Sequence, residues 1–182
     1  PDTLQQSQYF DLENKKLYNY SAYLSDGVDT NRNYSIEIRD KQGRVLKGST
    51  SFLPKPRIDS IVVRYDADRD SAAGIIVWMK DFAGQANYYR IVLNEDSLSG
   101  AASLDFTFTD NLGDGKEIPI GTSYRFKKKQ TLYIRMFHIE KQYYDYLESL
   151  QDANRANGNP FAQPAIVKSA MEGGYGIFTT LN

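Results

Sequence analysis

The sequence has no cysteine and one histidine, His138, among its 182 residues. Without cysteine the chain can form neither disulfides nor thiolate metal sites, and it has no cysteine nucleophile. A single imidazole excludes a metal site built from several histidines and leaves a Ser-His-Asp triad one candidate base. Enzyme classes that need these groups are therefore excluded or depend on His138.

Neither sign of charge dominates the chain, and it has no long apolar run. Lysine and arginine number 22 against 23 aspartates and glutamates, which gives a net charge of -1. Such a chain lacks the broad positive field that draws proteins to nucleic acid or anionic lipid. No run approaches the ~20 apolar residues that span a bilayer as a helix. Because hydrophobic residues make up 41% of the sequence, we expect a folded protein with a sizeable core.

Short alternating segments separated by turn residues predict an all-β fold. Loops rich in glycine, aspartate and asparagine separate segments in which apolar side chains alternate or gather, at residues 58–65, 74–80, 87–93, 103–109 and 131–139. This spacing favours an immunoglobulin- or fibronectin-like β-sandwich over residues 56–182.

A small or incomplete β module is predicted before this sandwich, over residues 1–55. Pro54 and Pro56 cannot donate to a strand ladder, so we place the boundary there. Within the module, a hairpin turns at Gly43, and residues 1–14 form a loose arm or a remnant strand. Because about three strands bury little surface, the module has either lost strands or packs against the sandwich.

The apolar period changes near the C-terminus. Tyr143, Leu147 and Leu150 follow the spacing i, i+4, i+7, which predicts one amphipathic helix over about 140–155. We expect its aromatic stripe to cover an open end or edge of the sandwich, since exposed strand edges need cover. A final strand at residues 177–181 is expected to return to the sheet.

Six segments in a fixed order carry a resemblance to a known family. They are a hairpin containing Tyr34, SFLPKPRIDSI (51–61), Asp81 followed by NYYR (87–90), YYDYLESL (143–150), NPFA (159–162) before Pro164, and Ser169 before EGGYGIF (172–178). In these segments the chain resembles a domain-of-unknown-function family of Bacteroidetes cell-envelope lipoproteins. Genes of that family often lie beside those of TonB-dependent outer-membrane receptors. The chain departs from the family at Ala170-Met171, where the family has Asn-Ile, and in its shorter N-terminal module.

The resemblance implies a lipoprotein tethered to the outer membrane, with an immunoglobulin-like module before a fibronectin-like sandwich. The lipid-bearing cysteine would precede Pro1, so a lipid anchor outside this chain would be its contact with the membrane. No catalytic residue carries over from the family. The expected function is therefore that of a non-enzymatic accessory lipoprotein that binds a TonB-dependent transporter assembly or its cargo, without a cofactor and without nucleic acid.

Three alternate carboxylates offer a candidate calcium site. Asp66, Asp68 and Asp70 supply the hard oxygen ligands that calcium prefers, at the spacing that opens a calcium-binding loop. The rest of that pattern is missing, because Ser71 and Val77 stand where the loop needs glycine and glutamate. A solvated loop between two strands is the alternative interpretation.

Other side chains define rival functions. The 14 tyrosines suggest a surface adhesin or glycan-binding module, in which exposed rings such as those of Tyr144 and Tyr175 contact a ligand or partner. A hydrolase would use His138 as its base, whereas the alternative is a histidine packed where sheet and helix meet. A structural subunit that exchanges a strand between protomers remains a further alternative.

Overall fold

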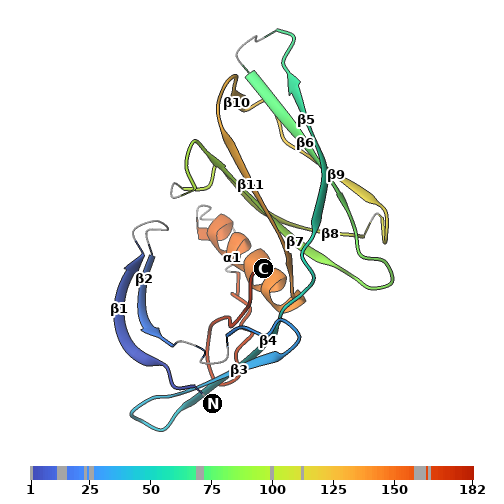
Figure 1. Ribbon diagram of the computed structural model, residues 1–182. Helices are drawn as coiled ribbons and strands as arrows, with labels where there is room; N and C mark the ends of the chain where they lie inside the picture. The colour runs from blue at the N-terminus through green and yellow to red at the C-terminus, as the bar shows by residue number, and fades with distance from the viewer. Residues whose placement is uncertain are drawn as a thin grey trace.

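The computed structural model describes residues 2–11, 16–22, 24, 27–68, 72–98, 101–111, 113–157, 163 and 165–182. These residues form eleven β-strands followed by one α-helix, so the predicted all-β fold with a C-terminal helix is confirmed (Figure 1). The elements are β1 (Gln5–Asp11), β2 (Lys16–Ser21), β3 (Asn33–Arg39), β4 (Val45–Ser51), β5 (Arg57–Tyr65), β6 (Ala72–Lys80), β7 (Tyr88–Glu95), β8 (Leu104–Thr109), β9 (Glu117–Gly121), β10 (Phe126–Lys127), β11 (Leu132–Ile139) and α1 (Lys141–Asn157).

Two antiparallel sheets share the main core. One sheet has the order β10-β6-β5, with β9 also paired to β6, and the other has the order β11-β7-β8. Side chains alternate along each strand, so every second residue points between the sheets. The buried cluster between the sheets consists of Ile75, Val77, Met79, Tyr89, Ile91, Leu93, Ile120 and Phe126.

Short turns decide which strands face each other across this core. Residues 81–87 connect β6 to β7, and residues 110–116 connect β8 to β9. Since such short connections cannot travel far, β6 faces β7 and β9 faces β8, which leaves β5 opposite β11. A contact at one end supports this placement, because Nδ1 of His138 in β11 lies 3.2 Å from the carbonyl oxygen of Pro54, just before β5.

The helix α1 covers the outer face of the sheet β11-β7-β8. Tyr143 is buried there, and its hydroxyl accepts a hydrogen bond of 2.6 Å from Arg90 of β7. Further along, Thr107 of β8 donates a hydrogen bond to Glu148. The predicted helix is thus confirmed to within about two residues at its ends. The expectation that it covers an open end or edge of the sandwich is wrong, because its aromatic stripe packs on the face of a sheet.

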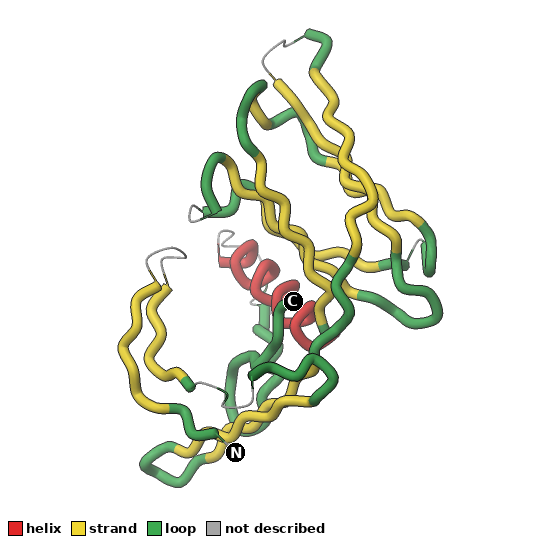
Figure 2. The backbone as a smooth tube through the Cα atoms, viewed as in Figure 1, coloured by secondary structure: helices red, strands yellow, loops and turns green. Residues whose placement is uncertain are grey.

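Two hairpins make up the N-terminal part of the chain. Strands β1 and β2 pair with each other, as do β3 and β4 (Figure 2). The N-terminal arm is therefore largely a strand. Gly43 turns the second hairpin with φ 81°, a conformation that favours glycine, as the sequence predicted. The carboxylate of Glu140, at the start of α1, accepts hydrogen bonds from the hydroxyls of Thr50 (2.6 Å) and Ser51 (3.2 Å), so β4 is fastened to the helix.

The C-terminal segment does not form the strand expected at residues 177–181. It runs instead beside the end of β4, where the hydroxyl of Thr180 donates to the carbonyl oxygen of Ser51 at 2.7 Å. The terminal Asn182 donates to the carbonyl oxygen of Leu53 at 3.3 Å. The expectation is wrong because hydrogen bonds to Thr50, Ser51 and Leu53 hold this segment beside the end of β4 instead of in a sandwich sheet.

Candidate functional site

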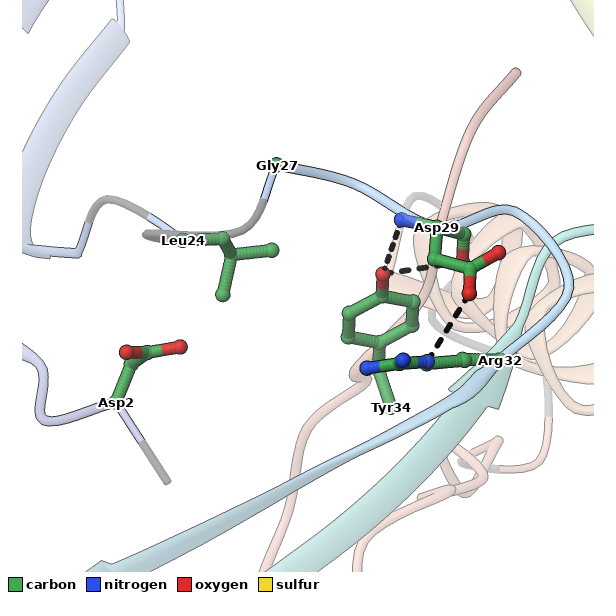
Figure 3. Close-up of a pocket in the computed structure, with 6 residues that line it drawn as sticks. All are labelled: Asp2, Leu24, Gly27, Asp29, Arg32 and Tyr34. Carbon is green, nitrogen blue, oxygen red and sulfur yellow. Dashed lines mark hydrogen bonds and ion pairs between the residues drawn. The ribbon is translucent and has the colours of Figure 1, made fainter.

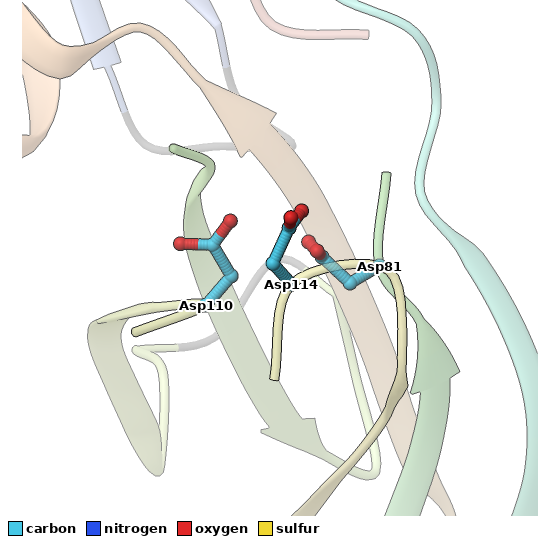
Figure 4. A group of neighbouring side chains, drawn as sticks. All are labelled: Asp81, Asp110 and Asp114. Atoms are coloured by element: carbon cyan, nitrogen blue, oxygen red, sulfur yellow. The ribbon is translucent and has the colours of Figure 1, made fainter. Parts of the chain in front are cut away.

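Three carboxylates meet at one end of the sandwich. Asp81 lies in the turn after β6, and Asp110 and Asp114 lie in the turn between β8 and β9 (Figure 4). One oxygen of each lies within 4.8 Å of the others, and Asp81 and Asp110 are buried whereas Asp114 is exposed. Oxygen ligands of this kind suit a hard cation such as Ca²⁺ or Mg²⁺.

Protein donors already occupy these carboxylates. Asp81 accepts a hydrogen bond of 2.5 Å from the Tyr89 hydroxyl at one oxygen and of 2.8 Å from the Gly115 amide at the other. Asp110 accepts from the backbone amide of Asn87 at 2.9 Å. Such charge-assisted bonds stabilise buried carboxylates without a cation. These carboxylates therefore have a structural role: their hydrogen bonds join the turn after β6 to the turn between β8 and β9, an arrangement we call the structural lock.

The sequence held a weak signal for this cluster. The motif DNLGDG (110–115) indicates a turn, and Asp81 follows a buried strand. The two positions are about thirty residues apart, so only the pairing of β6 with β9 brings them together.

The predicted calcium residues lie elsewhere. Asp66 follows β5, at the opposite end of β6 from Asp81, and its carboxylate accepts a hydrogen bond of 3.0 Å from the amide of Asp68. Asp70 lies outside the described residues. The structure thus brings Asp66 and Asp68 together as a locally bonded turn.

His138 is packed inside the sandwich core. Its ring stacks on Phe82 and on Tyr89, with both centroids 5.1 Å away, and burial lowers the pKa of the imidazole. Among the residues that the structure describes, no carboxylate forms a hydrogen bond with this ring. Burial, and then the hydrogen bond to Asp81, raise the pKa of Tyr89 well above its usual range, so its hydroxyl stays protonated and donates.

The helix tyrosines are held against the sheet. Arg90 joins Asp105 of β8 at 2.6 Å and also donates to Tyr143, so one guanidinium links a strand to the helix. Tyr144 is half-buried and packs on Tyr88 with ring centroids 5.0 Å apart. Tyr144 therefore contributes to packing, with part of its ring left for a ligand.

Tyr175 stands in solvent on a loop that is held by hydrogen bonds. Its side chain is 82% exposed. The hydroxyl of Ser169 organises the loop around it, because it accepts from the amides of Met171 and Gly176, both at 3.1 Å, and donates to the carbonyl oxygen of Gly174 at 2.7 Å. Tyr175 is thus an exposed ring on a hydrogen-bonded loop, and its role as a contact residue stays a prediction.

Two concavities lie in the N-terminal part of the molecule. One of about 210 Å³ is lined by Asp2, Leu24, Gly27, Asp29, Arg32 and Tyr34 (Figure 3). There the Tyr34 hydroxyl accepts from the Asp29 amide at 2.8 Å and donates to its carbonyl oxygen at 3.0 Å, which fixes the loop before β3. The other, of about 440 Å³, lies between the hairpin β3–β4, the start of α1 and the loop that carries Glu172.

Large apolar side chains are exposed on the hairpin β1–β2. Phe10 and Leu17 face each other across the pair, and each is at least half exposed, as is Tyr20. A two-stranded hairpin alone is marginally stable in water. Phe10 and Leu17 therefore form an exposed apolar pair on one face of the hairpin, whereas Tyr20, three residues along β2, lies on the other face.

Comparison with known proteins gives one result. The family described as "Domain of unknown function (DUF4249)" matches residues 3–182 of the chain. Neither curated proteins nor solved structures gave a significant match. The helix of the described residues is not long and apolar enough to cross a membrane.

Proposed function

The chain belongs to the DUF4249 family, and we propose from this premise that the protein is a non-enzymatic accessory lipoprotein of the outer membrane. It binds a TonB-dependent transporter assembly or the cargo of that assembly. The observation that carries the proposal is the apolar pair Phe10 and Leu17, exposed on a hairpin that packs little against the rest of the chain. A lipid anchor outside this chain tethers it, as the resemblance of the sequence motifs implies.

The state of the titratable groups supports a binding role. The lone imidazole, on His138, has aromatic rings against it and a lowered pKa. Asp81 and Asp110 hold turns together through hydrogen bonds to Tyr89 and Asn87. These groups stabilise the fold, and the exposed surface remains for partner contact.

Co-purification from membranes tests the proposal. A tagged protein is extracted from membranes of its native host with mild detergent, and we expect a TonB-dependent receptor to elute with it. Leu17→Lys should abolish that co-elution, because it places a charge in the apolar contact. Ile166→Lys is the matched control, since Ile166 is 81% exposed on a different segment. If the wild-type protein repeatedly elutes without a receptor, the proposal is wrong.

A glycan-binding adhesin is the second candidate, and the presentation of Tyr175 favours it. An exposed ring on a hydrogen-bonded loop can stack on the apolar face of a sugar. A glycan array should then show binding that Tyr175→Ala removes and that Tyr144→Ala weakens, because part of the Tyr144 ring is left for a ligand. An array without signal for the wild-type protein removes this candidate.

A further inference from the structure

Both sandwich sheets end on the same flank in unpaired strands. Strand β5 pairs with β6 and ends one sheet, and β11 pairs with β7 and ends the other. Within the described residues, no backbone hydrogen bond reaches the outer edge of either strand. Figure 1 shows the course of β5 and β11. We call the free edge of β11, together with the inward side chains of β5, the open flank.

Side chains on the inner face of β5 are much more exposed than their neighbours in the same sheet. Ile61 and Val63 are 48% and 49% exposed, whereas their partners across the ladder, Val77 and Ile75, are 1% and 2% exposed. Tyr65 continues the same face and is 57% exposed. Because cross-strand partners point to the same side, Ile61, Val63 and Tyr65 point toward the core side and still contact water.

In the opposite sheet, too, the inward side chains of the edge strand are less buried than those of its neighbour. The inward residues of β7 are fully buried, whereas Leu132, Ile134 and Met136 of β11 are only partly buried against the core. The inward side chains are therefore buried in β6 and β7 and become more exposed in the edge strands β5 and β11. One further strand beside β11 would lie over both groups of apolar side chains.

We propose that the open flank accepts an extended segment of a partner polypeptide, which pairs with β11 as a fourth strand. This goes beyond the proposed function, whose contact lies on the hairpin β1–β2, and rests on it for the kind of partner. A row of unpaired N–H and C=O groups is complementary to another strand. Pairing with β11 is favoured over pairing with β5, because a strand beside β11 lies across the core and covers the exposed faces of Ile61 and Val63, whereas a strand beside β5 would only flank them.

The size of the apolar surface selects a single strand over a second copy of this chain. Ile61, Val63 and Tyr65 are each about half exposed. Even if each were as large as an aromatic side chain, which buries 150–250 Å², together they would expose about 300 Å² of apolar surface. Stable interfaces between globular proteins bury about 1,200–2,000 Å² in total. The open flank is too small for such an interface, whereas one strand also gains backbone hydrogen bonds. Its alternate residues would be apolar, to meet Ile61 and Val63.

Selection from a peptide library tests this assignment. Phage displaying random segments of eight residues, the length of β11, are selected on the immobilised full chain. We expect enrichment of segments with alternating apolar residues. Bound peptide should slow hydrogen exchange at alternate amides of β11, which form the free edge. Val63→Lys should weaken the binding of the selected peptides by about tenfold or more, a loss of 1.4 kcal/mol.

Val62→Lys is the matched control. Val62 neighbours Val63 and is 42% exposed, but it points to the outer face of the sheet, so binding should be retained. The exchange measurement on the wild-type chain needs no variant and covers the case in which Val63→Lys does not fold.

Three results would overturn the assignment: no enriched alternation, protection of amides on another element such as β2, or self-association of the chain through this flank. None of them depends on membrane extracts, so failure here is distinguishable from failure of the transporter partnership.

Discussion

Removal of the Tyr89 hydroxyl tests whether the acidic cluster is a structural lock. Tyr89 is 0% exposed and donates to Asp81 at 2.5 Å. Tyr89→Phe keeps the ring and its stacking on His138, so the only space lost is that of the hydroxyl oxygen. A hydrogen bond to a charged group contributes about 1.5–3 kcal/mol, and its loss leaves a buried carboxylate oxygen without that donor. We therefore expect the free energy of unfolding to fall by about 2 kcal/mol.

Urea denaturation followed by circular dichroism measures this loss. The slope of the transition should stay the same while its midpoint falls, because the native surface does not change. Tyr133→Phe is the control, since Tyr133 is exposed on the outer face of β11 and should lose less than ~0.5 kcal/mol. An equally small loss in Tyr89→Phe would refute the reasoning.

A small loss would also point to a cation as the group that satisfies Asp81. Added calcium chloride should then raise the thermal midpoint of the wild-type protein, and Asp114→Asn should remove the rise. If Asp81 depends on Tyr89, calcium should leave the midpoint unchanged. In that case Tyr89→Phe and Asp81→Asn should show a coupling of about 0.5–3 kcal/mol in a double-mutant cycle.

Three further substitutions each test how one side chain or glycine contributes to the stability of the fold. Gly173→Ala should destabilise by about 2 kcal/mol or more in urea melts, because a Cβ there would lie 2.1 Å from the carbonyl oxygen of Val45 and φ is 82°; Gly84→Ala, with φ 89° and open space, should lose only the backbone part, so equal losses would contradict the contact. His138→Phe should flatten the decline in stability between about pH 7.5 and 5.5. Burial lowers the folded-state pKa below 6.5, so its contribution is present above that pH and is lost as the unfolded chain takes up a proton below it. Arg90→Met should lower the free energy of unfolding by about 2 kcal/mol through the loss of both its polar partners; a loss below that of an exposed control would show that α1 is held by packing alone.

The helix and the strands of the sandwich could be predicted because each carries its own local period. The spacing of Tyr143, Leu147 and Leu150 predicts a helix whatever the surrounding fold. The alternation at residues 103–109 predicts a half-buried strand in the same way. What the stripe cannot define is the surface it packs on. That choice depends on Arg90 and Thr107, which lie far away in the sequence.

The acidic cluster and the path of the C-terminus could not be predicted for a related reason. Asp81 and Asp114 meet through strand pairing, and no local pattern encodes the register of β6 with β9. Residues 177–181 have the composition of a strand, but Thr180 bonds to Thr50 and Ser51 at the end of β4. A short apolar run favours extended backbone, but tertiary contacts determine whether it pairs with another strand.

One residue at the end of β11 explains why the sandwich is open on one flank. The chain leaves β11 at Ile139 and enters α1 at Lys141, so Glu140 is the whole connection. A hairpin return would need at least a two-residue turn before a strand could pair with the free edge of β11. The bonds of Glu140 to Thr50 and Ser51 instead direct the chain toward the hairpin β3–β4, and the helix then runs along the outer face. The same carboxylate that joins the two halves of the protein thus keeps the position beside β11 free for a strand from elsewhere.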